Sequence, residues 1–207
     1  MLKKKGKLVS VYNHKGGTGK SSISYSIAND LEALYITNDT FNSIVSTIYD
    51  KVIEELNDDI IANNTVLYDG GGFFDETTKD ILKHSDLIIV PVEADLNSLK
   101  SLESFLRELQ KINKNIIYIL NKIESSKTAQ REYLEVREHL ISEFDINNKD
   151  IFKLPHSRIF KNIFDEEMGI KKLINNSKKN QYTYRNLLPQ YQAILNRIEK
   201  ITPILFK

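Results

Sequence analysis

Residues 9–22, VSVYNHKGGTGKSS, combine a short apolar run, three glycines and the beginning of a helical pattern. The apolar run is typical of a buried strand. Glycines allow backbone N–H groups to converge on phosphate oxygens, and the first turn of a helix adds free N–H groups and the positive end of its dipole. Because strand, glycine loop and helix follow one another in this order, the segment predicts a phosphate-binding loop.

Two side chains after the last glycine supply the charge and the metal ligand that a bound triphosphate needs. Lys20 is expected to lie as a point charge between the β- and γ-phosphates, and the Ser21 hydroxyl to bind Mg²⁺. The general pattern G-x-x-x-x-G-K-[ST] would place glycine at position 14, where this chain has His14. The pattern that does fit is K-G-G-x-G-K-[ST], in which a second lysine, Lys15, precedes the glycines.

This deviant Walker A pattern resembles the phosphate loop of the ParA/MinD family of ATPases. In that family the additional lysine reaches across a dimer to the partner's nucleotide. The resemblance implies a homodimer that binds ATP and Mg²⁺, hydrolyses ATP slowly, and uses Lys15, Lys20 and Asp39 as catalytic residues. The residues expected to bind ATP are Lys15, Gly16, Gly17, Thr18, Gly19, Lys20, Ser21, Ser22, Asn121, Lys122 and Pro155.

The composition is that of a soluble globular protein. At 207 residues the chain is long enough for one well-buried α/β domain, residues 1–207, and too short for two of ordinary size. It has no cysteine, which excludes disulfides and cysteine-ligated metal clusters, including the cluster of the related nitrogenase iron protein. No apolar run approaches the length of a membrane span, and the basic start MLKKKGK leads into a strand. We expect a cytoplasmic protein.

Apolar runs that alternate with helical patterns predict the fold. After the first strand, further strands are expected at residues 33–37, 65–68, 86–91, 115–121 and 151–154. Helices are expected at residues 44–53, 75–84, 96–109, 125–144 and 180–207. This order predicts a single-domain α/β fold with a mostly parallel, twisted sheet and helices on both faces, in which ligands bind at the carboxyl ends of the strands.

Two aspartates at strand ends are candidates for organising Mg²⁺. Asp69 ends a buried strand and precedes three glycines, so it is expected to hold Mg²⁺ through water, as a Walker B aspartate does, while the glycines let the segment move with the γ-phosphate. In the ParA family the second strand ends in D-x-D-P-Q. Here Thr37 replaces the first aspartate, Asp39 keeps the second, and Phe41 replaces the glutamine.

The resemblance implies that Asp39 helps to organise Mg²⁺ and the attacking water without binding the metal directly. The alternative is that Asp39 only caps the following helix. Two later segments resemble the family in layout: Asn121-Lys122, where the family places an asparagine near the adenine, and a segment led by Pro155 that contacts the base.

The net charge of +1 conceals an uneven distribution, because residues 168–207 carry eight Lys and Arg against one Glu. Such a region suggests an anionic partner, and the alternative is a solvated basic face. Phosphate contacts would give affinity for DNA of any sequence. The candidate DNA-binding residues are Lys171, Lys172, Lys178, Lys179, Arg185 and Arg197.

The resemblance extends from residue 8 to about residue 169 and implies a plasmid or chromosome partition ATPase. Such a protein binds non-specific double-stranded DNA in its ATP state, acts with a ParB-type adaptor and associates with the nucleoid, with no stable membrane association. Two alternatives remain: a MinD-type positioning ATPase whose terminal amphipathic helix lies on a membrane, and a nucleotide switch with negligible turnover. We favour a terminal helix packed on the sheet, because apolar residues at helical spacing usually pack in a core.

Overall fold

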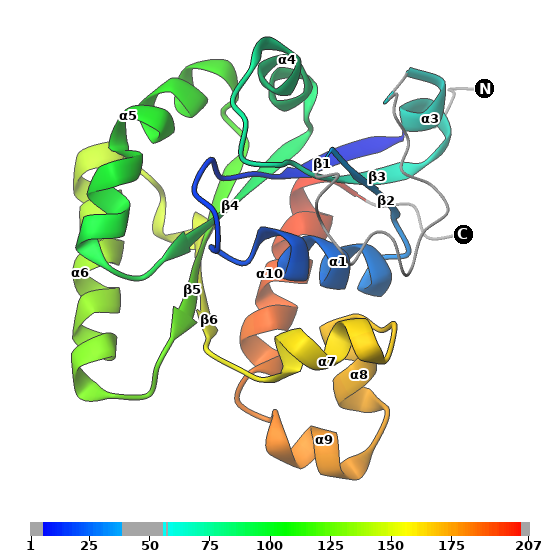
Figure 1. The fold of residues 1–207 in the computed structure, drawn as a ribbon, viewed down its shortest axis with the longest axis vertical. Helices are drawn as coiled ribbons and strands as arrows, with labels where there is room; N and C mark the ends of the chain where they lie inside the picture. Colours follow the sequence, from blue (N-terminus) through cyan, green and yellow to red (C-terminus); the bar gives the residue numbers. More distant parts are fainter. Residues whose placement is uncertain (1–5, 39–55, 57, 204–207) are drawn as a thin grey trace.

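The structure, a computed structural model, describes residues 6–38, 56 and 58–203, and a six-stranded sheet forms its centre (Figure 1). The strand order is β2-β3-β1-β4-β5-β6, and every neighbouring pair is parallel. The strands are β1 (Lys7–Val11), β2 (Leu34–Thr37), β3 (Thr65–Asp69), β4 (Leu87–Glu93), β5 (Ile116–Ile123) and β6 (Ile151–Pro155). The predicted parallel α/β fold is confirmed. Asp39, Phe41 and the helix predicted at residues 44–53 lie outside the described residues.

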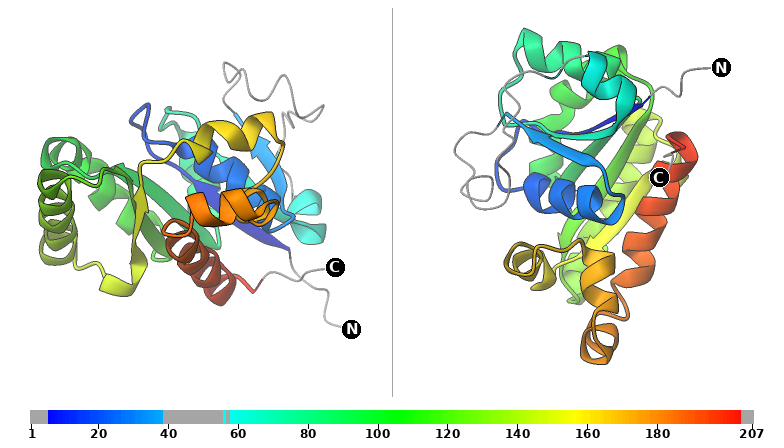
Figure 2. Two further views of the ribbon diagram at one scale, coloured as in Figure 1. Left: turned by 90° about the horizontal axis from the view of Figure 1, so that it is seen from below. Right: turned by 90° about the vertical axis from the view of Figure 1, so that its right-hand side faces the viewer.

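Helices cover both faces of the sheet (Figure 2). One face packs against α1 (Lys20–Asp30), α7 (Ile159–Asp165), α8 (Ile170–Asn175) and α10 (Leu188–Ile201). The other packs against α3 (Asp58–Asn63), α4 (Glu76–His84), α5 (Leu96–Ile112) and α6 (Lys127–Phe144). The remaining elements within the described residues are α9 (Lys178–Thr183), which follows α8, and the 3-10 turn η1 (Asn148–Asp150), which precedes β6.

Strand β4 shows why the sequence of this sheet reads as continuous apolar runs. Ile89 packs in the core layer of α1 and α10, whereas Ile88 and Val90 pack in the layer of α5 and α6. All three side chains are fully buried. A parallel strand covered by helices on both faces needs apolar side chains at successive positions.

Strand β1 lies in the middle of the sheet, and the register places Val11 opposite Asp69 of β3 and Ile89 of β4. Strands β2 and β3 lie on one side of β1, and β4, β5 and β6 lie on the other. The loop after such a strand stands where the strand order reverses, which is where open parallel sheets bind ligands. The predicted phosphate loop follows β1 and therefore occupies this position.

The single helix predicted for residues 180–207 is wrong. The structure has two helices there, because α9 ends at Thr183 and α10 begins at Leu188. Pro189 lies in the first turn of α10. Proline lacks an N–H and its ring clashes with a preceding helical turn, so a helix begins near it but does not run through it. The predicted apolar stripe is confirmed on α10, where the buried residues are Tyr191, Ile194, Leu195 and Ile198.

The carboxyl end of α1 caps the beginning of α8. Asp30 accepts hydrogen bonds from the backbone N–H groups of Lys171 at 2.9 Å and Lys172 at 3.0 Å. Burial raises the pKa of Asp30, and these two hydrogen bonds oppose that shift. Gly169 approaches Asp30 so closely that a Cβ would lie 2.3 Å from the carboxyl carbon. Since the first N–H groups of a helix have no partner within it, α8 depends on this carboxylate.

Asp30→Ala is expected to lower the free energy of unfolding by about 1–3 kcal/mol, because two N–H groups lose their acceptor. The measurement is urea-induced unfolding. Asp165→Ala removes an exposed carboxylate from the end of α7 and serves as the control, with an expected change below about 0.5 kcal/mol. Equal changes in the two variants would contradict the role of Asp30.

Candidate functional site

The phosphate loop connects β1 to α1 through two glycines in the left-handed region. Gly17 has a φ of 76° and Gly19 a φ of 92°, which glycine adopts without strain. Gly19 is the N-cap of α1, and its carbonyl accepts a hydrogen bond from the N–H of Ile23 at 3.0 Å. The free N–H groups at the start of α1 therefore adjoin the loop, which is the arrangement of an anion site at a helix N-terminus.

Two neighbouring residues of β5 hold the loop. Asn121 donates from Nδ2 to the carbonyl of Thr18 at 3.0 Å, and Lys122 donates from Nζ to the carbonyl of Gly17. Asn121 is only 4% exposed, and a Cβ on Gly19 would lie 2.4 Å from its amide nitrogen. Both residues therefore fix the shape of the loop. The adenine contact expected for Asn121 stays a prediction.

Lys20 and Asp69 provide the charged groups of the site. The ammonium of Lys20 donates to the carbonyl of Lys15 at 3.0 Å, which places it inside the turn of the loop. Asp69 ends β3 beside β1, as expected, and is only 1% exposed. Burial raises the pKa of Asp69, while hydrogen bonds from Tyr35, Ser21 and Ser24 and the charge of Lys20 oppose that shift.

The partners of Asp69 include three residues that the sequence analysis does not select as site residues. Tyr35 donates its hydroxyl to Oδ2 at 2.7 Å, and Ser24 donates to Oδ1 at 3.1 Å. Thr37 donates from Oγ1 to the backbone carbonyl of Asp69 at 3.0 Å. Only the position of Thr37, where the ParA family has an aspartate, gives a sequence signal. Tyr35 and Ser24 are recognised once β2 and α1 are placed beside β3.

Lys15 is held by two residues of its own chain. Its Nζ donates to Oε2 of Glu93 at 3.1 Å and to the hydroxyl of Ser98 at 2.5 Å. Glu93, the last residue of β4, also pairs with Lys122 at 2.9 Å. Lys15, Glu93 and Lys122 come from different elements, so no spacing in the sequence relates them. Glu93 is therefore not among the predicted site residues.

The residues before the glycines are fixed as well. Asn13 donates from Nδ2 to the carbonyl of Pro91 at 2.7 Å and accepts from the N–H of Lys15 at 2.9 Å. His14 packs its ring edge-on against Phe105 of α5, with centroids 4.8 Å apart. Burial and the charge of Lys20 lower the pKa of His14, which favours the neutral ring. At the position of the usual glycine, this chain therefore has an aromatic contact with α5.

The glycines after Asp69 lie against the phosphate loop. A Cβ on Gly70 would come within 2.5 Å of the Tyr12 ring, and one on Gly72 would lie 3.2 Å from the His14 carbonyl oxygen. The N–H of Gly71 donates to Oδ1 of Asn38 at 2.6 Å. This close approach explains the absence of side chains at Gly70 and Gly72. The expected movement of the segment with a γ-phosphate stays a prediction.

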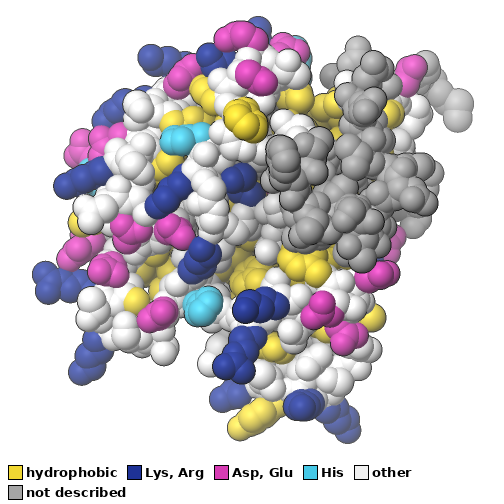
Figure 3. All heavy atoms as spheres, viewed as in Figure 1, with side chains coloured by type: hydrophobic (Ala, Val, Ile, Leu, Met, Phe, Trp, Pro, Cys, Tyr) yellow, Lys and Arg dark blue, Asp and Glu magenta, His cyan; other side chains and the backbone are white. Residues whose placement is uncertain are grey.

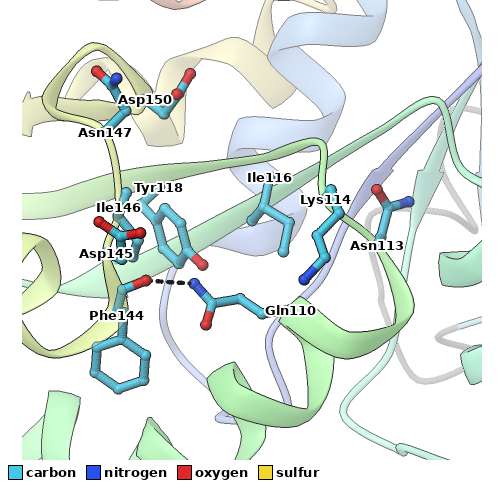
Figure 4. A pocket seen from close by; sticks show the side chains of 10 residues that line it. All are labelled: Gln110, Asn113, Lys114, Ile116, Tyr118, Phe144, Asp145, Ile146, Asn147 and Asp150. Carbon is cyan, nitrogen blue, oxygen red and sulfur yellow. Dashed lines mark hydrogen bonds between the residues drawn. The ribbon is translucent and has the colours of Figure 1, made fainter.

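Two cavities open at the carboxyl ends of β5 and β6. One, of about 400 Å³, adjoins Lys122, and the other, of about 410 Å³, adjoins Pro155. Lys122 and Pro155, two of the residues expected to bind ATP, thus each border open space at this edge of the sheet. A third cavity of about 370 Å³ lies beside Ile116 and Tyr118 of β5 (Figure 4). Because β5 begins at Ile116, this cavity lies toward the amino ends of the strands, whereas the phosphate loop lies at their carboxyl ends.

Lys and Arg side chains gather over the α7–α9 lobe, residues 159–183 (Figure 3). Of the candidate DNA-binding residues, those that are exposed are Lys172, Lys178, Lys179 and Arg185, and Lys171 is partly exposed. Two further exposed basic residues are not among those predicted: Arg158, just before the lobe, and Lys161, within it. Exposed acidic residues also lie there, at positions 165–167.

Arg197 does not belong with these exposed residues. It pairs with Asp150 at 2.5 Å, and the two side chains are only 18% and 16% exposed. Because this guanidinium is committed to a carboxylate between α10 and the turn before β6, we remove Arg197 from the candidate DNA contacts.

The donor set of the site fits a triphosphate with Mg²⁺. Mg²⁺ keeps several waters and usually takes one or two protein ligands besides phosphate oxygens. Ser21, with Asp69 acting through water, would provide that number. Among the residues that the structure describes, no group of three His, Cys, Asp or Glu side chains could hold a metal ion.

Solved structures share this fold. A putative plasmid partition protein from Borrelia burgdorferi, bound to AMPPNP, matches 95% of this chain and 99% of its own with a TM-score of 0.64 and 17% identity. An ATP complex of McdA from Cyanothece matches with a TM-score of 0.63 and 12% identity over 98% of each chain. A chain of the MinC:MinD cell division protein complex from Aquifex aeolicus matches with a TM-score of 0.64 and 13% identity, also over 98% of each chain. The fold is thus that of ParA-type, McdA and MinD proteins, in agreement with the resemblance of the phosphate loop.

No protein-family model matches the chain. GTPase Der from Nautilia profundicola is 25% identical over 174 residues, which are 80% of this chain and 33% of Der. The chain therefore spans about a third of the length of this curated relative.

Gly19→Ala is expected to lower the free energy of unfolding by about 1–3 kcal/mol, because the left-handed backbone strains any other residue and the new methyl meets Asn121. Gly16→Ala is the matched control within the same loop, since its Cβ meets nothing within 4 Å. We expect this control to stay within about 0.5 kcal/mol of the unsubstituted chain in thermal unfolding. A harmless Gly19→Ala would contradict the loop geometry.

Proposed function

We propose that this chain is a Mg²⁺-dependent ATPase of the ParA/MinD type that dimerises with ATP and acts in the partition of plasmid or chromosomal DNA. The observation that carries the proposal is the segment KGGTGKS at residues 15–21, placed after the central strand of a ParA/MinD-like sheet. Neighbours described with AMPPNP and ATP support ATP as the nucleotide. Because a curated relative is a GTPase, binding of ATP and GTP should be measured side by side.

Hydrolysis in this proposal depends on positioning and charge neutralisation, since phosphoryl transfer needs little covalent chemistry from the protein. The loop N–H groups and Lys20 hold the phosphates, and Ser21 and Asp69 hold Mg²⁺, which neutralises phosphate charge. Asp39 is proposed to orient the attacking water. The first arginine in the sequence is Arg107, so no arginine adjoins the loop or either aspartate along the sequence. We expect slow turnover that a partner stimulates.

The proposed dimer brings two triphosphates together across an interface. The negative charges of two triphosphates that face each other repel strongly unless cations lie between them. Lys15 is the cation proposed for this role, because Lys20 already serves the phosphates of its own protomer.

Lys15→Ala is expected to retain ATP binding by the monomer and to weaken the ATP-dependent dimer by about thirtyfold or more, as loss of one partner of a buried charge pair does. Light scattering during an ATP titration measures the dimer, and equilibrium dialysis measures ATP binding. The control is Lys100→Ala, which removes an exposed ammonium from α5. Normal dimerisation of Lys15→Ala would overturn the proposed role.

The α7–α9 lobe is the proposed contact with DNA phosphates. One observation favours DNA over a membrane: the apolar residues of α10 are buried in the core and do not face outward. No helix within the described residues is long and apolar enough to cross a membrane. The ParB-type adaptor and the nucleoid association are part of this proposal.

Lys178→Glu combined with Lys179→Glu is expected to weaken binding of double-stranded DNA of any sequence by about tenfold or more. Because two phosphate contacts are lost, the slope of the logarithm of the binding constant against the logarithm of the salt concentration should become shallower by about two. Filter retention with ATP, from low to physiological salt, measures the effect. Lys127→Glu, at the exposed start of α6, is the control on the opposite face. Absence of ATP-dependent retention by the unsubstituted chain at low salt, together with binding to anionic liposomes, would instead support the MinD-type alternative.

A further inference from the structure

Glu93 joins two lysines at the edge of the phosphate loop. Its Oε2 accepts from Lys15 at 3.1 Å, and its Oε1 accepts from Lys122 at 2.9 Å. Burial raises the pKa of Glu93, but the hydrogen bonds from Lys122 and Lys15 outweigh that effect, so the pKa lies below its ordinary value. The carboxylate is therefore charged at neutral pH and pairs with both ammonium groups.

Lys15 has contacts in its own protomer that oppose its movement toward a partner's site. An ammonium has three N–H donors, and Lys15 uses two of them on Glu93 and Ser98. Its side chain is 36% exposed and that of Glu93 is 28% exposed, so the pair is partly shielded from water. Breaking the pair opposes any movement of Lys15 toward a second protomer.

We propose that Glu93 is a positioning residue that holds Lys15 in its own protomer and thereby sets the ATP concentration at which the dimer forms. This inference rests on the proposed function, because it concerns the lysine that the dimer requires. It assigns a regulatory contribution to a residue at the end of β4 that need not touch the nucleotide.

The size of the effect follows from exposure and symmetry. A partly exposed ion pair changes an equilibrium by up to about fivefold. A symmetric dimer breaks two such pairs, so the dimer dissociation constant should change by up to about 25-fold. Lys122 is expected to retain its bond to the Gly17 carbonyl when Glu93 is replaced, which preserves the loop.

The experiment follows dimerisation by light scattering during ATP titrations of the unsubstituted chain and three variants. Glu93→Gln is expected to dimerise at lower ATP, with a dissociation constant up to about 25 times smaller. Ser98→Ala removes the uncharged partner of Lys15 and should shift the constant in the same direction by less. Glu138→Gln is the matched control, because Glu138 is an exposed glutamate of α6 and the substitution removes the same charge. It should leave the constant unchanged.

Two results would overturn this inference alone: no shift in Glu93→Gln, or an equal shift in Glu138→Gln. ATP binding by the monomer, measured in the Lys15→Ala background, provides a further test. The contradicting outcome in that background is that Glu93→Gln tightens ATP binding by the same factor by which it lowers the dimer dissociation constant of the chain with Lys15. In that case Glu93 acts on the nucleotide and not through Lys15, and the inference is wrong. An unsubstituted chain that stays monomeric at saturating ATP would overturn the proposed function and the inference together.

Discussion

The buried carboxylate of Asp69 is the constraint on which the geometry of the site depends. A buried charge without partners is strongly unfavourable, so neighbouring elements must bring hydrogen-bond donors to it. Tyr35 of β2 and Ser24 of α1 do so directly, and the register of β1 places Val11 beside Asp69. Four elements are thereby held together at the carboxyl end of the central strands, close to where α1 begins.

The phosphate loop is held by a second set of polar contacts, from β5. Glycine adopts the left-handed region without strain, but its many other conformations must be excluded for the loop to keep one shape. Asn121 and Lys122 bond the carbonyls of the two residues before Gly19, and Asn13 bonds the N–H of Lys15. Because side chains of the protein hydrogen-bond to these backbone groups, the shape of the loop does not depend on the glycines alone.

The sequence predicts the features of this protein that depend on neighbouring residues in the chain. Strand β4 is recognisable because burial on both faces requires an uninterrupted apolar run, and the phosphate loop because its glycines and lysines are consecutive. The interruption between α9 and α10 was also predictable, since Pro189 cannot continue a helix, but the apolar spacing on both sides of it suggested one helix.

Contacts between distant segments could not be predicted in this way. A periodic pattern tells which face of an element is buried but not which element lies opposite. Tyr35 reads as an ordinary strand residue until β2 is placed beside β3, and Glu93 as an exposed strand end until β4 is placed beside the loop. The pairing of Arg197 with Asp150 has the same origin, and it changes the candidate DNA surface.

Helix α1 connects the two surfaces on which the proposed function depends. Its 11 residues correspond to roughly 16 Å, with the phosphate loop at one end and Asp30 at the other. Asp30 accepts hydrogen bonds from the N–H groups of Lys171 and Lys172. The hydroxyl of Ser26 accepts a hydrogen bond from the N–H of Ile170 and lies 3.0 Å from the hydroxyl of Tyr191. The basic lobe is thus attached to the nucleotide site through one regular helix and not through a linker. In a dimer formed around the phosphate loops, the orientation of the two lobes would follow directly from the orientation of the two α1 helices.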